Sequence, residues 1–290
     1  MFYITMKTAT TTTEQIALLK QRGMIISNEQ HVSNMLLSVG YYRLGFYWYP
    51  YEIPTSVGDR THYFARNTTW EKVEALYNFD DEFRGILSSY LQVIETDIRT
   101  FLTYTVSNKY KNDPTWFANP KYVKQTFIDG LPNIYADTIK NEVIKAHHNK
   151  YRNDKYAPAW KTIEFFTFGN VLALYHALND ADVRKTIILR YGIKYEKIFT
   201  SYAETLRVVR NLCAHGHNVY DAKLRRGICS GPAHLLENED SNVRGILKVT
   251  YYMLHVIDEQ KENKLRLAIK TLVENPDYQI IKKKLRDIVY

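Results

Sequence analysis

The longest regular pattern in the chain is a stripe of apolar positions that recurs at intervals of three or four residues. Its members are Leu76, Phe79, Phe83, Leu87, Tyr90, Ile94, Ile98 and Phe101. An α-helix places residues of this spacing on one face, where they can pack against a core. The stripe therefore predicts one long helix from about Thr69 to Lys109, ended by Asp113-Pro114.

Shorter apolar patterns, bounded by capping residues and glycines, predict helices along most of the chain. Thr11 with Glu14, and Ser27 with Gln30, have the spacing of capping boxes and predict two short helices that form an N-terminal hairpin. Further helices are expected over 121–150, 163–178, 182–190, 195–215, 242–258, 259–274 and 277–290, with a long loop over 216–241.

These elements predict an all-α protein, a multi-helix bundle with additions. The aromatic run from Tyr41 to Pro50 suits a strand or an irregular packed segment. We expect a first domain over 1–68, with the helical hairpin and the aromatic segment. A helical domain over 69–290 follows it, with a helical insertion around 115–157.

The composition is that of a soluble globular protein, with 45% hydrophobic and 24% charged residues among 290. No apolar run approaches the length of a membrane span, and residues 1–13 do not resemble a secretory signal. Two cysteines provide no disulfide framework, so a cytoplasmic location is expected. The formal net charge of +8 is consistent with a polyanionic partner, and equally with ordinary solubility charge.

Candidate chemistry gathers at the predicted C-terminus of the 195–215 helix, in the run Arg210-Asn211-Leu212-Cys213-Ala214-His215-Gly216. Gly216 can end the helix in the left-handed conformation, which leaves His215 at the negative end of the helix dipole, where imidazolium is favoured. An arginine can hold a phosphate through two hydrogen bonds while an imidazole moves a proton. The alternative is an ordinary polar helix face, because Arg210 and His215 lie about 140° apart on a helical wheel.

Four blocks in the same order resemble the Abi-like (abortive infection) family of bacterial phage-defence proteins, relatives of the HEPN ribonucleases. They are Gly40–Pro50, Leu76–Asp80 with Ile94–Thr100, Phe166–Asn170, and Arg210–Gly216, the last similar to the R-x4-H element of HEPN nucleases. The resemblance implies a HEPN-like helical bundle, and an anti-phage toxin of the toxin–antitoxin kind that cleaves RNA without a metal or cofactor. It further implies that the site forms between the two protomers of a homodimer.

By this resemblance, Arg210 would hold the scissile phosphate, His215 would act as general base or acid, and Asn211 would orient the imidazole or the phosphate. The family typically has arginine where this chain has Asn218, and Arg207 and His217 are the candidates to replace its supporting phosphate contact. Glu95 and Arg99 are either a local i,i+4 ion pair or, as the resemblance suggests, a pair that supports Arg210 or His215.

The remaining basic residues are candidate RNA contacts or solvated surface charge: Arg43, Arg225, Arg226, Lys282, Lys283 and Lys284. His147 and His148 are adjacent on a helix and are expected to be solvated rather than metal ligands. A second hypothesis is a non-catalytic module that holds a small regulatory RNA, either an antitoxin or a guide-like RNA. A third is a toxin modified with nucleotidyl groups, given that Tyr220 follows the motif closely.

Overall fold

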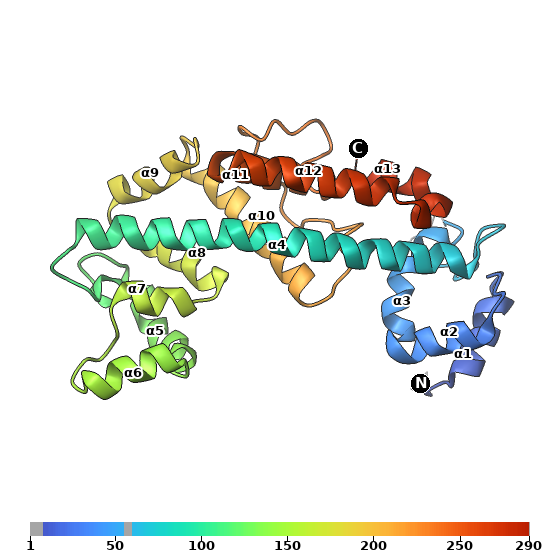
Figure 1. The fold of residues 1–290 in the computed structure, drawn as a ribbon, viewed down its shortest axis with the longest axis horizontal. Helices are drawn as coiled ribbons and strands as arrows, with labels where there is room; N and C mark the ends of the chain where they lie inside the picture. The colour runs from blue at the N-terminus through green and yellow to red at the C-terminus, as the bar shows by residue number, and fades with distance from the viewer. Residues whose placement is uncertain (1–7, 55–59, 290) are drawn as a thin grey trace, which may run out of the picture. The chain divides into compact units, whose positions relative to one another are not determined.

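A computed structural model of the protein describes residues 8–54 and 60–289, and every regular element among them is helical (Figure 1). The all-α prediction is confirmed. Only isolated bridges, such as Glu52 with Phe64, pair extended segments in this part of the chain. None of the described helices is both long enough and apolar enough to cross a membrane.

The chain forms two compact units. The first comprises the residues up to Phe83 together with Lys270–Asp287, and the second comprises Arg84–Ile269 together with the residues from Ile288 onward. Both include part of α4 (Trp70–Lys109), α12 (Glu259–Glu274) and α13 (Lys282–Val289). The other elements of the first unit are α1 (Thr12–Gln21), α2 (Glu29–Ser38), α3 (Tyr41–Trp48), η1 (Tyr49–Tyr51) and η4 (Pro276–Ile281). The expected boundary at residue 68 stays a prediction.

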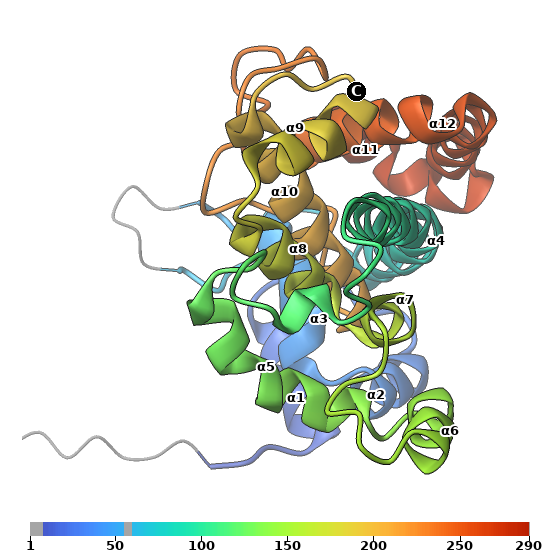
Figure 2. The ribbon, with the colours of Figure 1, turned by 90° about the vertical axis from the view of Figure 1, so that its left-hand side faces the viewer.

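The second unit contains most of the described helices, and Figure 2 shows α4 nearly end-on. They are η2 (Trp116–Ala118), α5 (Gln125–Thr138), α6 (Glu142–Lys150), α7 (Ala159–Thr162), η3 (Ile163–Phe165), α8 (Phe168–Ala177), α9 (Ala181–Arg190), α10 (Glu196–Ala214) and α11 (Val243–Ile257). The segment from Gly216 to Ser241 has no regular structure, as expected.

Helix α4 is 40 residues long and matches the helix predicted from the apolar stripe. Six of the eight stripe positions, from Leu76 to Ile98, are almost completely buried. The other two, Tyr90 and Phe101, are half-buried. Burial of one face explains why this helix forms, since packing rather than intrinsic propensity supplies most helix stability.

The segment from Tyr41 to Pro50 is not a strand or an irregular segment but the helix α3 and the 3-10 turn η1. Gly40, at φ +95°, makes the break after α2 that lets a new helix begin. Leu44, Tyr47 and Trp48, spaced as on one helix face, are buried. The helical spacing of these buried side chains outweighs the strand preference of aromatic residues. The Tyr47 hydroxyl donates to Asp80 of α4 at 2.8 Å, so two of the blocks that carry the family resemblance are in contact.

Of the two predicted capping boxes, the first is present and the second is wrong. The Thr11 hydroxyl accepts from the backbone of Glu14, whose carboxylate accepts from the backbone of Thr11. Helix α2 is capped instead by Asn28, which accepts from the backbone of His31, while Ser27 donates to Glu71 at 2.6 Å. An asparagine one residue later is an equally good N-cap, and Ser27 is used in a tertiary contact.

The predicted insertion contains α5 and α6, which pack through a small apolar cluster of Tyr135, Ile144 and Ala157. The expectation of solvated histidines is wrong there. His147 is buried and contacts Asp154 at 3.0 Å, and His148 contacts the Tyr135 hydroxyl at 2.7 Å. Both rings are therefore structural parts of this segment.

Asp180 joins the end of α4 to the start of α9. Its Oδ1 accepts from the backbone N–H groups of Asp182 and Val183, and its Oδ2 accepts from Tyr110 and pairs with Lys109 at 2.7 Å. The Lys109 ammonium, together with the Val183 N–H and the Tyr110 hydroxyl, lowers the pKa of Asp180 from 3.8 to about 2. The stabilisation that this ionised cap provides is therefore complete above pH 3.8 and is lost as the pH falls toward 2.

Replacing this cap tests the arrangement. We expect Asp180→Ala to lower the free energy of unfolding by about 1 kcal/mol at neutral pH, the usual value of an N-cap, and the difference from the parent to shrink below pH 4. Denaturant titrations at pH 7 and near pH 2.5 measure both values. Asp137→Ala, which removes an exposed partner of Lys140, is the control and should change stability by less than about 0.5 kcal/mol. An equal effect of Asp180→Ala at both pH values would contradict the assignment.

Candidate functional site

The motif helix α10 is amphipathic, and its last turns carry the candidate residues. Leu206, Val209 and Cys213 form the buried stripe that fixes the rotation of the helix. Arg210 and Asn211 follow Val209 and are half-buried, at the edge between the core and the solvent. The helix sequence therefore sets the side from which these two polar groups emerge.

Helix α10 ends as its sequence predicts, with His215 as the C-cap residue and Gly216 at φ +65°. The N–H of Gly216 donates to the carbonyl of Cys213 at 3.1 Å, and the N–H of His217 donates to that of Leu212 at 2.9 Å. This pair of bonds is the Schellman motif, which satisfies carbonyls left open at a helix end. His215 is thereby held, exposed, at the carbonyl end of the helix.

Arg210 is oriented by a carboxylate on another helix. Its Nε donates to Oε2 of Glu95 on α4 at 3.1 Å, and its Nη1 lies 3.4 Å from Oδ1 of Asn211. The side chain of Arg210 is 41% exposed, whereas that of Glu95 is only 7% exposed. No hydrogen bond engages Nη2 of Arg210 in the part of the chain that the structure describes. The guanidinium is thus fixed at one edge and accessible at the other.

Glu95 divides its carboxylate between two arginines. Its Oε1 accepts from Nη2 of Arg99 at 2.7 Å, and the same Nη2 donates to the carbonyl of Phe166 at 3.0 Å. Arg99 is 12% exposed, so this i,i+4 pair is largely shielded from water. The pair is a local ion pair and also contacts the motif helix, so the two interpretations of Glu95 and Arg99 are compatible.

The other predicted neighbours lie in different surroundings. Arg207, half-buried, pairs with Glu204 at 2.7 Å, and its Cδ packs over Gly169 of α8. His217 is exposed, with its ring centroid 6.4 Å from that of His215, and Asn218 is half-buried. No hydrogen bond joins Arg210 to His215 within the described residues. Tyr220 is buried, at 4% exposed, so a modifying enzyme could reach it only after the loop opens.

The expected RNA contacts do not belong to one unit. Arg43 and Lys282–Lys284 lie in the first unit, where the Lys284 ammonium stands over the ring of Tyr51 at 4.9 Å. Arg225 and Arg226 are exposed in the loop that follows the motif, in the second unit. Only these two share a unit with Arg210 and His215.

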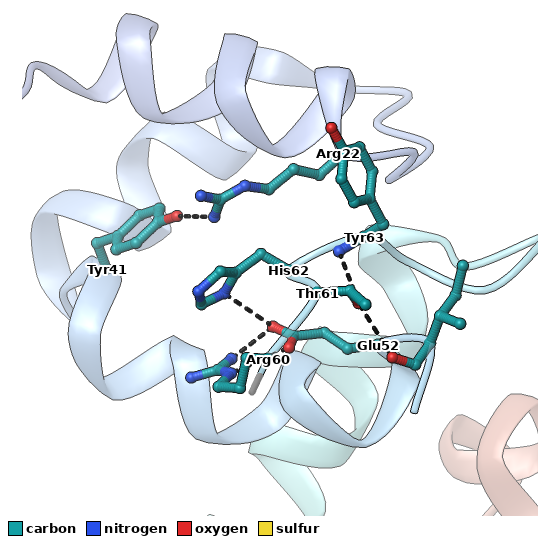
Figure 3. Close-up of polar contacts among 8 residues, drawn as sticks. Arg22, Tyr41, Glu52, Arg60, Thr61, His62 and Tyr63 are labelled. Carbon is teal, nitrogen blue, oxygen red and sulfur yellow. Dashed lines mark hydrogen bonds and ion pairs between the residues drawn. The ribbon is translucent and has the colours of Figure 1, made fainter. Parts of the chain in front are cut away.

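Sequence reasoning missed a charged cluster in the first unit (Figure 3). Glu52, whose side chain is nearly buried, binds Arg60 and lies 3.8 Å from His62 Nδ1, while Arg22 donates to the Tyr41 hydroxyl at 3.3 Å. Glu52 and Arg60 lie outside the regular helices, and His62 has a φ of +61°, so no periodic pattern could indicate that they meet. The cluster joins the segment around Glu52 to the segment around Arg60 and His62 within this unit.

No group of three or more His, Cys, Asp or Glu side chains that could hold a metal ion is found among the residues that the structure describes. The polar groups at the end of α10 are instead cations, an amide and an imidazole. Such a set binds anions and transfers protons.

Comparison with known proteins identifies one family. A model of the family described as Abi-like protein matches residues 34–221, about two thirds of the chain. The matched range includes all four blocks that carry the resemblance and ends shortly after the motif. Neither the curated proteins nor the solved structures include a match.

The carboxylate shared by the two arginines yields a stability prediction. We expect Glu95→Gln to lower the free energy of unfolding by about 1.5–3 kcal/mol, because Arg99 loses the counter-charge of its shielded guanidinium. Denaturant unfolding of the purified protein measures the loss. Glu142→Gln, which weakens an exposed i,i+3 pair with Lys145, is the matched control and should cost less than about 0.5 kcal/mol. Equal effects of the two substitutions would show that the Glu95 contacts stabilise the protein no more than an exposed surface ion pair does.

Proposed function

This chain belongs to the Abi-like protein family, and on that premise we propose that it is an abortive-infection toxin that cleaves RNA. The observation that carries the proposal is the setting of Arg210, whose guanidinium is fixed by Glu95 and accessible at its other edge. A pre-oriented guanidinium stabilises the charge that develops on a phosphate during cleavage, with little reorganisation at the moment of reaction.

In this mechanism Arg210 binds the oxygens of the scissile phosphate through its Nη groups. His215, exposed at the helix end, removes the proton of the ribose 2′-hydroxyl, whose oxygen attacks the phosphorus. The bond from phosphorus to the 5′-oxygen breaks, and a second imidazole donates a proton to that oxygen. The products are a 2′,3′-cyclic phosphate and a 5′-hydroxyl end. DNA lacks the 2′-hydroxyl and should not be cleaved.

The proposed site is dimeric. The two steps require one imidazole as base and one as acid, and each chain supplies one His215. Arg210 faces Glu95 on α4, while the ring of His215 lies beside that of His217. A second copy of the chain, related by twofold symmetry, would bring its own Arg210 and His215 to the same phosphate. Asn211, already within 3.4 Å of Arg210, would help to keep the guanidinium in place.

A second candidate function is a non-catalytic module that holds a small regulatory RNA. Its support is the net charge of +8 and the exposed Arg225 and Arg226 beside the motif. A defined RNA that copurifies intact would favour this function, and it raises the ratio of absorbance at 260 nm to that at 280 nm. Steady degradation of added RNA would favour catalysis.

Substitution of the two motif residues tests the nuclease directly. We expect Arg210→Ala and His215→Ala each to reduce RNA cleavage by at least about 100-fold and to abolish toxicity in cells, with helicity unchanged by circular dichroism. Matched controls are Arg152→Ala and His31→Ala, which remove an exposed arginine and a partly exposed histidine elsewhere. Cleavage by both motif variants at the parent rate would refute the nuclease.

Metal removal is a separate test of the same mechanism. Because the proposed acid, base and phosphate-binding groups are side chains, we expect cleavage to continue at the same rate after the protein is dialysed against EDTA. Rates before and after dialysis, on one RNA, decide the point. Activity that disappears with EDTA and returns with a divalent cation would mean that a metal takes part.

A further inference from the structure

A groove of about 530 Å³ runs along the C-terminal half of α4 and is bordered by α7. Figures 1 and 2 both show α7 beside this part of α4. The volume lies in the range of small-molecule sites, which is about 300–1,000 Å³. From Arg99 to Asn108 the lining follows about 14 Å of α4, at 1.5 Å per residue, and Lys111 lies just beyond the end of the helix. Neither the sequence motif nor the mechanism above uses it.

Two exposed aromatic rings line the groove. Tyr104 is 64% exposed and Trp160 is 55% exposed, although aromatic side chains of this size usually pack into a core. The other three tryptophans, Trp48, Trp70 and Trp116, are buried. Exposed rings provide flat faces on which unpaired bases stack, whatever their sequence.

The walls of the groove also have unused hydrogen-bonding capacity. Within the described residues, Oγ1 of Thr103 and Nε of Arg99 are buried without a hydrogen-bond partner. A threonine in a helix has two accessible χ1 rotamers, so one rotation can turn the Thr103 hydroxyl toward a ligand. Asn108 uses its amide nitrogen on the carbonyl of Tyr104, which leaves its Oδ1 as an acceptor. Hydroxyl and amide groups of this kind pair with the edges of a base.

The groove is connected to the proposed site by two hydrogen bonds. Arg99, in its wall, donates to Oε1 of Glu95, and Oε2 of the same carboxylate accepts from Arg210. Arg99 is paired with Glu95, so Lys111 and Glu164 are the other charged groups of the lining. The Lys111 ammonium can pair with a phosphate of a backbone that continues from Arg210 along α4.

We propose that this groove binds an unpaired base of the RNA, next to the phosphate held by Arg210. The inference rests on the proposed function, because it takes RNA as the substrate. Trp160 and Tyr104 provide the stacking surfaces, Thr103 and Asn108 contact the base edge, and Lys111 attracts the backbone.

The fluorescence of Trp160 offers a direct test, because the other tryptophans are buried. The protein carries His215→Ala, so that the probe, a single-stranded eight-nucleotide RNA of mixed sequence, stays intact. We expect saturable quenching of tryptophan fluorescence by this RNA, and no such quenching when Trp160→Phe is added. Anisotropy of a labelled copy of the RNA should show that the Trp160→Phe protein still binds it, since phenylalanine can also stack.

The RNA affinities of further variants then distinguish base stacking from nonspecific attraction by positive charge. Trp160→Ala and Tyr104→Ala should each weaken RNA binding about 5- to 150-fold, the range expected for the loss of one stacked base. Tyr195→Ala is the matched control, because Tyr195 is 69% exposed at the start of α10 and does not line the groove. It should change the affinity less than twofold.

Two results would overturn the inference. One is unchanged RNA affinity in the Trp160→Ala protein. The other is a free nucleoside monophosphate that binds the groove as tightly as the eight-nucleotide RNA, which would indicate a mononucleotide site. Failure of the proposed function looks different. The groove would then bind RNA as described, while the His215→Ala protein, in a separate assay, would cleave RNA as fast as the parent.

Discussion

A carboxylate that is nearly buried must have cationic or hydrogen-bonding partners, and Glu95 satisfies this requirement with two arginines from two helices. Arg99 lies one turn away on the same helix and also binds the carbonyl of Phe166. Arg210 comes from the motif helix, 115 residues later in the sequence. Much of the candidate site follows from this contact, because it fixes α10 against α4 and sets the direction of the Arg210 guanidinium.

The site combines rigid and exposed parts. Arg210 is held on packed helices, and the Schellman turn at Gly216 fixes the backbone beside His215. Both side chains still reach solvent, as the proposed contact with RNA requires. The groove along α4 is linked to this site, since Arg99 belongs to the Glu95 ion pair and also to the groove wall. In the proposed function, one face of α4 orients Arg210 and receives the neighbouring base of the RNA.

Local features of the site and fold could be predicted from the sequence, and long-range features could not. The apolar stripe predicted α4, and Gly216 predicted the end of α10, because both signals depend on residues close in sequence. The i,i+4 spacing predicts that Glu95 and Arg99 pair, but the contact of Glu95 with Arg210 was only one of two interpretations. The helix α3 was missed because the strand preference of aromatic residues conflicts there with the helical spacing of Leu44, Tyr47 and Trp48. The groove and the Glu52–Arg60–His62 cluster depend on tertiary packing, which leaves no periodic pattern.

A double-mutant cycle between Glu95 and Arg210 measures the central interaction most directly. Glu95→Gln, Arg210→Met and the double variant each remove the ion pair while keeping the approximate size of the side chains. If the two groups interact as the structure shows, the sum of the stability losses of the two single variants will exceed the loss of the double variant by about 1 kcal/mol or more. Losses that add to within about 0.3 kcal/mol would show that Glu95 does not hold Arg210.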